Sequence, residues 1–162
     1  MYEELYALFV HVLADWLIIP IILVGVFALI RYVPRARRYQ VYVRIGMMGL
    51  SALLIGKLMT LVYQPDTIRP FLEAGVQPGA LYLNNPGFPS DHTLLVFTIT
   101  LAVWVATKKT KLTTFLLLCS MAVGVGRVVA LVHTPADVLG AIVAVAIAGL
   151  IWYHRELFTI KK

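Results

Sequence analysis

Three short motifs in this sequence bring together residue types that suit phosphoryl transfer. In chain order they are Lys57 followed by Arg69-Pro70, then Pro89-Ser90-Asp91-His92, then Gly126-Arg127 followed by His133 and Asp137. A phosphoryl group in transfer needs positive donors around its equatorial oxygens. Arg69 and Arg127 can supply bidentate contacts and Lys57 a point charge. The motifs therefore indicate a site that binds a phosphate group.

The second and third motifs also carry groups that can do the chemistry. His92 and His133 can divide the roles of nucleophile and proton donor, because imidazole titrates near neutral pH. Asp137 stands four residues after His133, which suits a carboxylate that fixes the ring tautomer and raises its basicity. We expect a helix to begin at about Pro89, and its free N–H groups would add an anion site.

Each motif has a structural interpretation when it is taken alone. Thr134-Pro135-Ala136-Asp137 is typical of a helix start with a threonine N-cap. Ser90 can be an N-cap only, and Arg69 and Arg127 can pair with lipid headgroups. We favour the chemical interpretation because the motifs occur together, and capping and catalysis are compatible for Asp137.

Two further features are interpreted as structural. His11 and Asp15 are spaced like a catalytic pair on the first apolar run, but neither belongs to a motif. Cys119 is the single cysteine and lies inside an apolar run, where we expect it to pack as a small side chain.

The composition predicts a membrane protein. Hydrophobic residues make up 60% of the chain and charged residues 14%, whereas soluble domains have about 25% charged residues. The net charge of +6 raises the possibility of nucleic-acid binding. However, the basic residues stand in short clusters between apolar runs, as cytoplasmic loops do. We therefore expect no nucleic-acid partner, and one domain over residues 1–162.

Five apolar runs approach the ~20 residues that cross a bilayer as a helix. They are Leu5–Ile30, Val41–Tyr63, His92–Thr107, Leu112–Val132 and Pro135–Tyr153. The sequence thus predicts an all-α fold, a polytopic transmembrane helix bundle of about five spans. The start of the chain lacks a basic n-region, so we expect the first run to remain in the mature protein. Pro20 should bend that run without a functional role.

The basic residues predict the orientation. Most of them fall in three connections that five crossings place on one side: Arg31, Arg35, Arg37, Arg38 and Arg44; Lys108, Lys109 and Lys111; and Arg155, Lys161 and Lys162. Such connections are cytoplasmic, so the C-terminus is expected inside and the N-terminus outside. Lys57, Arg69 and Arg127 are left at the outer helix ends, where a charge usually marks a functional site.

Residues 64–88 form the one long outer loop in this topology. Their many Pro and Gly residues predict irregular backbone with a short helix near Phe71. The loop also carries apolar side chains that either lie on the membrane surface or pack over the bundle: Phe71, Leu72, Leu81, Tyr82 and Phe88.

Together the motifs resemble the signature of the type 2 phosphatidic-acid phosphatase superfamily of membrane lipid phosphatases. That signature is Lys-x6-Arg-Pro, then Pro-Ser-Gly-His, then Ser-Arg-x5-His-x3-Asp, and the third motif matches in its spacing from Arg127 to Asp137. The resemblance implies that His133 is the nucleophile and forms a phosphohistidine, that Asp137 orients it, and that His92 protonates the leaving oxygen. It assigns phosphate binding to Lys57, Arg69 and Arg127, helped by Ser90 and the backbone near Asp91. It implies no metal and no cofactor.

Three positions depart from the signature. Lys57 is separated from Arg69 by eleven residues instead of six, and Val62 occupies the family position. Asp91 replaces a glycine and would repel phosphate unless a neighbouring cation pairs with it. Gly126 replaces a serine and removes one hydroxyl donor. These departures leave the two histidines and Asp137 intact, but they affect expectations for rate and substrate.

The resemblance implies an enzyme that removes phosphate from a lipid phosphate or diphosphate at the outer face of a prokaryotic plasma membrane. Undecaprenyl diphosphate is the favoured substrate, and phosphatidylglycerol phosphate and phosphatidic acid are alternatives. A lipid phosphotransferase, or a lipid-phosphate binding or transport protein without turnover, are further alternatives. The expected partners are the lipid substrate and membrane lipids, and the oligomeric state is left open.

Overall fold

The computed structural model describes residues 1–63, 69–85 and 87–153. Its described residues form helices and connecting segments, with no strand among them. In chain order the elements are α1 (Tyr2–His11), the π-helix η1 (Val12–Trp16), α2 (Ile18–Tyr32), the 3-10 helix η2 (Arg35–Arg37), α3 (Arg38–Val62), α4 (Pro70–Glu73), α5 (Asp91–Thr107), α6 (Thr110–Val129) and α7 (Pro135–Tyr153). The prediction of an all-helical membrane protein is confirmed.

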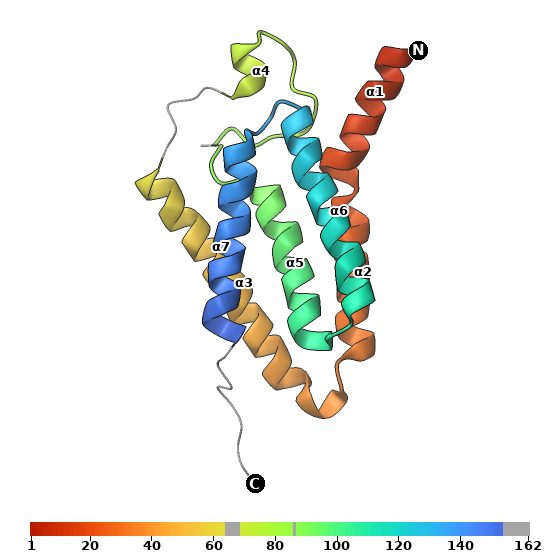
Figure 1. Cartoon of the computed structure of the whole chain (residues 1–162), viewed down its shortest axis with the longest axis vertical. Helices are drawn as coiled ribbons and strands as arrows, with labels where there is room; N and C mark the ends of the chain where they lie inside the picture. Colours follow the sequence, from red (N-terminus) through yellow and green to blue (C-terminus); the bar gives the residue numbers. More distant parts are fainter. Residues whose placement is uncertain (64–68, 86, 154–162) are drawn as a thin grey trace.

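The central helix of the bundle is α5, which packs against α2, α3, α6 and α7 (Figure 1). Among the described residues, four helical segments are long and apolar enough to cross a membrane: Tyr2–Tyr32, Arg35–Val62, Thr110–Val129 and Pro135–Tyr153. At 17 residues, the α5 helix is shorter than each of these four segments, which surround it. Figure 1 shows the start of α5 set back from the ends of α6 and α7 that meet at the α6–α7 turn.

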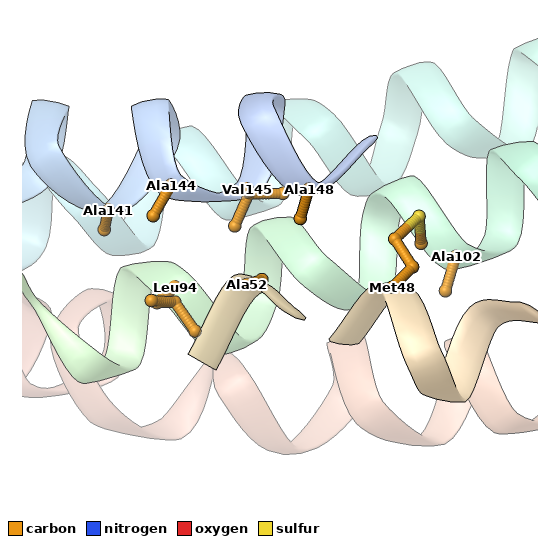
Figure 2. Close-up of a cluster of buried hydrophobic side chains, with 8 residues drawn as sticks. All are labelled: Met48, Ala52, Leu94, Ala102, Ala141, Ala144, Val145 and Ala148. Carbon is orange, nitrogen blue, oxygen red and sulfur yellow. The ribbon is translucent and has the colours of Figure 1, made fainter. Parts of the chain in front are cut away.

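Small side chains allow α3, α5 and α7 to pack closely. The buried cluster that joins them is shown in Figure 2 and consists of Met48, Ala52, Leu94, Ala102, Ala141, Ala144, Val145 and Ala148. Lipid tails are as apolar as these residues, so helix association in a membrane depends on close packing, which small residues favour. Gly149 continues the same face, because a Cβ there would lie 2.8 Å from the Leu101 side chain.

The two ends of the bundle differ in what they carry. Figure 1 shows the α2–α3 and α5–α6 connections and the end of α7 at one end, and the N-terminus, α4 and the α6–α7 turn at the other. At the first end, Arg44 donates hydrogen bonds to the Trp152 carbonyl at 2.9 and 2.7 Å, which ties α3 to α7. The predicted basic cluster at Arg155, Lys161 and Lys162 lies outside the described residues. The side of the membrane that each end faces stays a prediction.

Two predicted spans differ from the observed helices. The first is interrupted by η1, and regular α-helix resumes at Ile18. Pro20 has no N–H for the carbonyl of Trp16, so the expected bend coincides with this change of helix type, and α1 leans away from α2 in Figure 1. The fourth span was predicted to run roughly to Val132, three residues beyond the observed end of α6. The α6 helix ends at Val129 because Leu131 adopts a left-handed φ of 59°.

The outer loop packs over the α6–α7 turn. Phe71 donates its N–H to the Leu131 carbonyl at 3.0 Å, and Gly79 donates to the Ala130 carbonyl at 3.0 Å. Phe71 and Phe88 are buried, whereas Leu72, Leu81 and Tyr82 are exposed. Phe71 and Phe88 therefore pack over the bundle, and contact of the exposed three with the membrane surface stays a prediction. The short helix expected near Phe71 is α4, and residues 64–68 and 86 lie outside the described part.

Candidate active site

His133 and Asp137 meet at the turn between α6 and α7. The Nδ1 atom of His133 lies 3.4 Å from Oδ2 of Asp137, and both residues are buried, at 5% and 4% exposure. The same carboxylate oxygen accepts the backbone N–H of Thr134 at 2.8 Å, while Thr134 Oγ1 accepts the N–H of Asp137 at 3.2 Å. Asp137 therefore caps the first turn of α7 and contacts the histidine ring with one side chain.

This contact favours one tautomer of the His133 ring. An ionised carboxylate only accepts hydrogen bonds, so Nδ1 carries the proton and Nε2 keeps its lone pair. Burial lowers the pKa of His133 below its ordinary value, and the positive charges of Arg127 and Arg69 lower it further, while the hydrogen bond to Asp137 opposes them. The lowered pKa favours the neutral form of the ring.

The start of α5 is joined to the same turn. Ser90 is fully buried, and its Oγ accepts hydrogen bonds from the N–H and the hydroxyl of Thr93 at 3.5 and 3.1 Å, so it caps α5. The Ser90 N–H donates to the Asp137 carbonyl at 3.0 Å. This bond brings the N-terminus of α5, with His92 as its second and half-buried residue, next to the first turn of α7. A contact of Ser90 or His92 with phosphate stays a prediction.

Arg127 is the largest fully buried side chain in the described part of the chain, at 0% exposure. Its carbonyl accepts the N–H of His133 at 3.3 Å, so the arginine and the histidine are joined through the backbone. Its Nη1 donates to Oδ1 of Asp15 at 2.8 Å. Its Nε is buried and has no hydrogen-bond partner among the described residues. The hydrogen-bonding capacity of this buried guanidinium is therefore not fully used within the described residues.

Arg69 fastens the outer loop to the site. Its guanidinium donates to the Val132 carbonyl, to the Leu83 carbonyl at 3.0 Å and to Oδ1 of Asn85 at 2.9 Å. Gly87 lies between it and Asp137, since a Cβ on Gly87 would be 3.8 Å from Arg69 Cζ and 3.6 Å from Asp137 Oδ2. Arg69 therefore lies close to Asp137, and its bonds to the loop give it a structural role that its motif did not predict.

Lys57 reaches the rim of the site from α3. Its Nζ lies 3.9 Å from Oδ1 of Asp91, and Asn85 donates to Oδ2 of the same carboxylate at 3.1 Å. The neighbouring cation that Asp91 was expected to require is thus present. Both side chains of the pair are substantially exposed, at 68% and 44%. Whether the lysine also binds phosphate stays a prediction.

Comparison with known proteins identifies the family. The family model described as the PAP2 superfamily matches residues 40–159. The chain belongs to the PAP2 superfamily. It is also 31% identical over 120 residues, 74% of its length, to the undecaprenyl-diphosphatase BcrC of Bacillus subtilis (strain 168), and it spans 59% of the length of that relative. No solved structure matched the chain.

The structure brings Asp15 to the site of this PAP2 protein, although the sequence patterns predicted no functional role for it. It lies in η1, before the matched residues 40–159, yet its carboxylate contacts the guanidinium of the motif residue Arg127. One signal was present in the sequence, because a carboxylate within an apolar span is costly and usually functional. Asp15 was nevertheless interpreted as structural, because it does not belong to the PAP2 signature.

Proposed function

We propose that this protein is a metal-independent lipid phosphatase whose reaction proceeds through a phosphohistidine at His133. The observation that carries the proposal is the buried His133–Asp137 pair at 3.4 Å, on a turn whose backbone is hydrogen-bonded to Arg127. A buried histidine whose Nδ1 is held by a carboxylate presents Nε2 as a nucleophile. The adjacent guanidinium groups and the N-terminus of α5 supply the positive environment that phosphoryl transfer needs.

In the first step the lone pair of His133 Nε2 attacks the terminal phosphorus. The P–N bond forms as the bond from phosphorus to the leaving oxygen breaks, and His92, which enters this step as the imidazolium beside the bound phosphate, gives a proton to that oxygen and becomes neutral. Asp137 stabilises the positive charge that develops on the ring. Arg127 and Arg69 stabilise the charge on the equatorial oxygens, as positive groups do at such transition states.

In the second step water replaces the histidine. The neutral His92 accepts a proton from the water as its oxygen attacks phosphorus, the P–N bond breaks, and the electron pair returns to Nε2 of His133. Inorganic phosphate leaves and both histidines regain their starting protonation states. The cycle therefore needs only water and the lipid substrate.

The preferred substrate we propose is undecaprenyl diphosphate, which would be converted to undecaprenyl phosphate on the extracytoplasmic side of a plasma membrane. The name of the Bacillus relative supports this lipid, and the concentration of basic residues in the connections at the other end of the bundle supports this orientation. Phosphatidylglycerol phosphate and phosphatidic acid carry the same terminal phosphate group and are the competing substrates.

The test is phosphate release by the protein purified in detergent, with EDTA present, from each of these three lipids. Wild type and His133→Ala are compared, and the lipid products are analysed for transfer of phosphate to a second lipid. We expect turnover of undecaprenyl diphosphate by wild type and none by the variant. Phosphate that appears on a second lipid would instead indicate a phosphotransferase. Absence of release from all three lipids would leave a binding or transport protein.

A further inference from the structure

The side chain of Asp15 is placed at the site by a change in helix type. The N–H of Leu17 donates to the carbonyl of Val12, five residues earlier, at 2.9 Å. A π-turn of this kind contains one residue more than an α-turn, so the side chains beyond it change direction. Such turns are frequent at functional sites. The π-helix η1 packs against α6, the helix that carries Arg127.

Gly126 makes this packing possible. A Cβ at Gly126 would lie 2.8 Å from the backbone N of Ala14 and 2.9 Å from the carbonyl carbon of Leu13. These are backbone atoms that cannot move aside, so only glycine allows η1 to approach α6 this closely. The departure of Gly126 from the serine of the signature therefore has a structural consequence. It lets Asp15, which follows Ala14 in η1, reach Arg127, which follows Gly126 in α6.

Asp15 and Arg127 form a buried ion pair. Oδ1 of Asp15 accepts from Nη1 of Arg127 at 2.8 Å, and the two side chains are 8% and 1% exposed. Oδ2 of Asp15 accepts the N–H of Leu81 in the outer loop at 3.0 Å and lies 3.3 Å from Nδ1 of His11. A guanidinium held in this way, in a region with little water, keeps one orientation.

We propose that Asp15 is a positioning residue of the active site, which holds Arg127 so that its unpaired Nε–H meets an oxygen of the substrate phosphate. The inference rests on the proposed phosphatase function. Two observations support it together: the carboxylate occupies only Nη1, and the buried Nε has no partner among the described residues. Buried polar groups are almost always hydrogen-bonded, so an unpaired one in a site requires an explanation. A phosphate oxygen supplies that partner.

The competing interpretation is that Asp15 only neutralises a buried charge and stabilises the fold. The structural and the positioning interpretations predict different kinetic effects when Asp15 is replaced. A purely structural role lowers the fraction of folded enzyme, and therefore the apparent kcat, while KM and the affinity for phosphate stay the same. A positioning role changes KM and phosphate affinity in protein that is fully folded.

The experiment compares wild type with Asp15→Asn, Asp15→Ala, Arg127→Gln and the double variant Asp15→Asn/Arg127→Gln. Glu4→Ala is the matched control, because Glu4 is an exposed carboxylate on the same N-terminal span. For each folded protein, kcat and KM are measured with undecaprenyl diphosphate. The dissociation constant of inorganic phosphate is measured by calorimetry. The double variant removes both buried charges, so it avoids leaving one of them unpaired.

We expect Asp15→Ala to lower kcat/KM about 100-fold, the order of magnitude for a misplaced catalytic contact, and to weaken phosphate binding. Asp15→Asn should lose less, because the amide oxygen still accepts from Arg127. The double variant should equal Arg127→Gln. Unchanged KM and phosphate affinity in the Asp15 variants, or losses that multiply in the double variant, would overturn the inference. Phosphate binding tests it even if wild type hydrolyses no lipid, which would refute only the proposed function.

Discussion

The Nδ1 atom of His133 and the Oδ2 atom of Asp137 lie 3.4 Å apart, although one residue is in the α6–α7 turn and the other in the first turn of α7. The helix start itself creates this contact, because the Oδ2 that caps Thr134 also faces the ring. The carboxylate is thus fixed by the backbone before it acts on the histidine. An orienting group that is held in this way needs no rearrangement during the reaction.

The first prediction concerns the pH dependence of turnover. Burial lowers the pKa of His133, so the neutral nucleophile persists as the pH falls through the ordinary histidine value of 6.5. The acid limb of the kcat/KM profile should therefore have its midpoint below pH 6.5. A profile measured with undecaprenyl diphosphate checks this. A midpoint above 6.5 would mean that His133 is not the titrating nucleophile.

The Asp137→Asn variant gives a second test in the same pH profile of kcat/KM. The hydrogen bond that His133 donates to Asp137 raises the pKa of His133, opposing burial and the two arginines, so its loss should move the acid limb to still lower pH. The rate should fall by roughly 10³- to 10⁴-fold, as when an orienting carboxylate is replaced by an amide in a triad. A large loss of rate with an acid limb at higher pH would contradict the assigned contact.

The second prediction concerns the exposed pair Lys57–Asp91. Asp91→Asn removes a negative charge beside the phosphate site and should lower KM for a lipid diphosphate by about two- to fivefold, the range for an exposed ion pair. Lys57→Gln should raise KM by a similar factor. Both changes should shrink at about 1 M salt, where screening is strong. Lys111→Gln, at the opposite end of the bundle, is the control. Equal KM values in all variants would exclude Lys57 and Asp91 from substrate binding.

The third prediction concerns the contact between Gly126 and η1. Gly126→Ser restores the residue of the PAP2 signature, but its Cβ would lie 2.8 Å from the backbone of Ala14. We expect the free energy of unfolding to fall by about 1–3 kcal/mol, the usual cost of overpacking, and the melting temperature to fall with it. Gly46→Ser is the matched control, since a Cβ there meets nothing within 4 Å. A serine that is tolerated equally at both positions would contradict the close approach of η1 and α6.

The parts of the site that sequence patterns predicted are the local ones. His133 and Asp137 are four residues apart around a helix start, and Ser90 precedes an apolar helix, so their geometry follows from secondary structure alone. The helices were predicted because long apolar runs in lipid must satisfy their own backbone hydrogen bonds. Their ends were predicted less well, as at α6, where a single left-handed residue, Leu131, stops the helix.

The parts that sequence patterns missed depend on contacts between distant segments. Asp15 and Arg127 are 112 residues apart in the sequence. They meet because the π-helix η1 packs against α6 at Gly126. Arg69 was predicted as a phosphate ligand, but its bonds to Leu83 and Asn85 depend on how the outer loop folds over the site. Neither arrangement leaves a periodic pattern in the sequence.

The fourth prediction tests the central claim, that His133 carries the phosphoryl group during turnover. Undecaprenyl diphosphate labelled in its terminal phosphate is mixed with the enzyme, the reaction is quenched in base within milliseconds, and the protein is digested and analysed by mass spectrometry. We predict a base-stable, acid-labile phosphate on the peptide that contains His133, formed and lost at rates consistent with kcat. His133→Ala should show neither label nor turnover. Turnover that proceeds in that variant, or without any label on His133 in wild type, would contradict the mechanism.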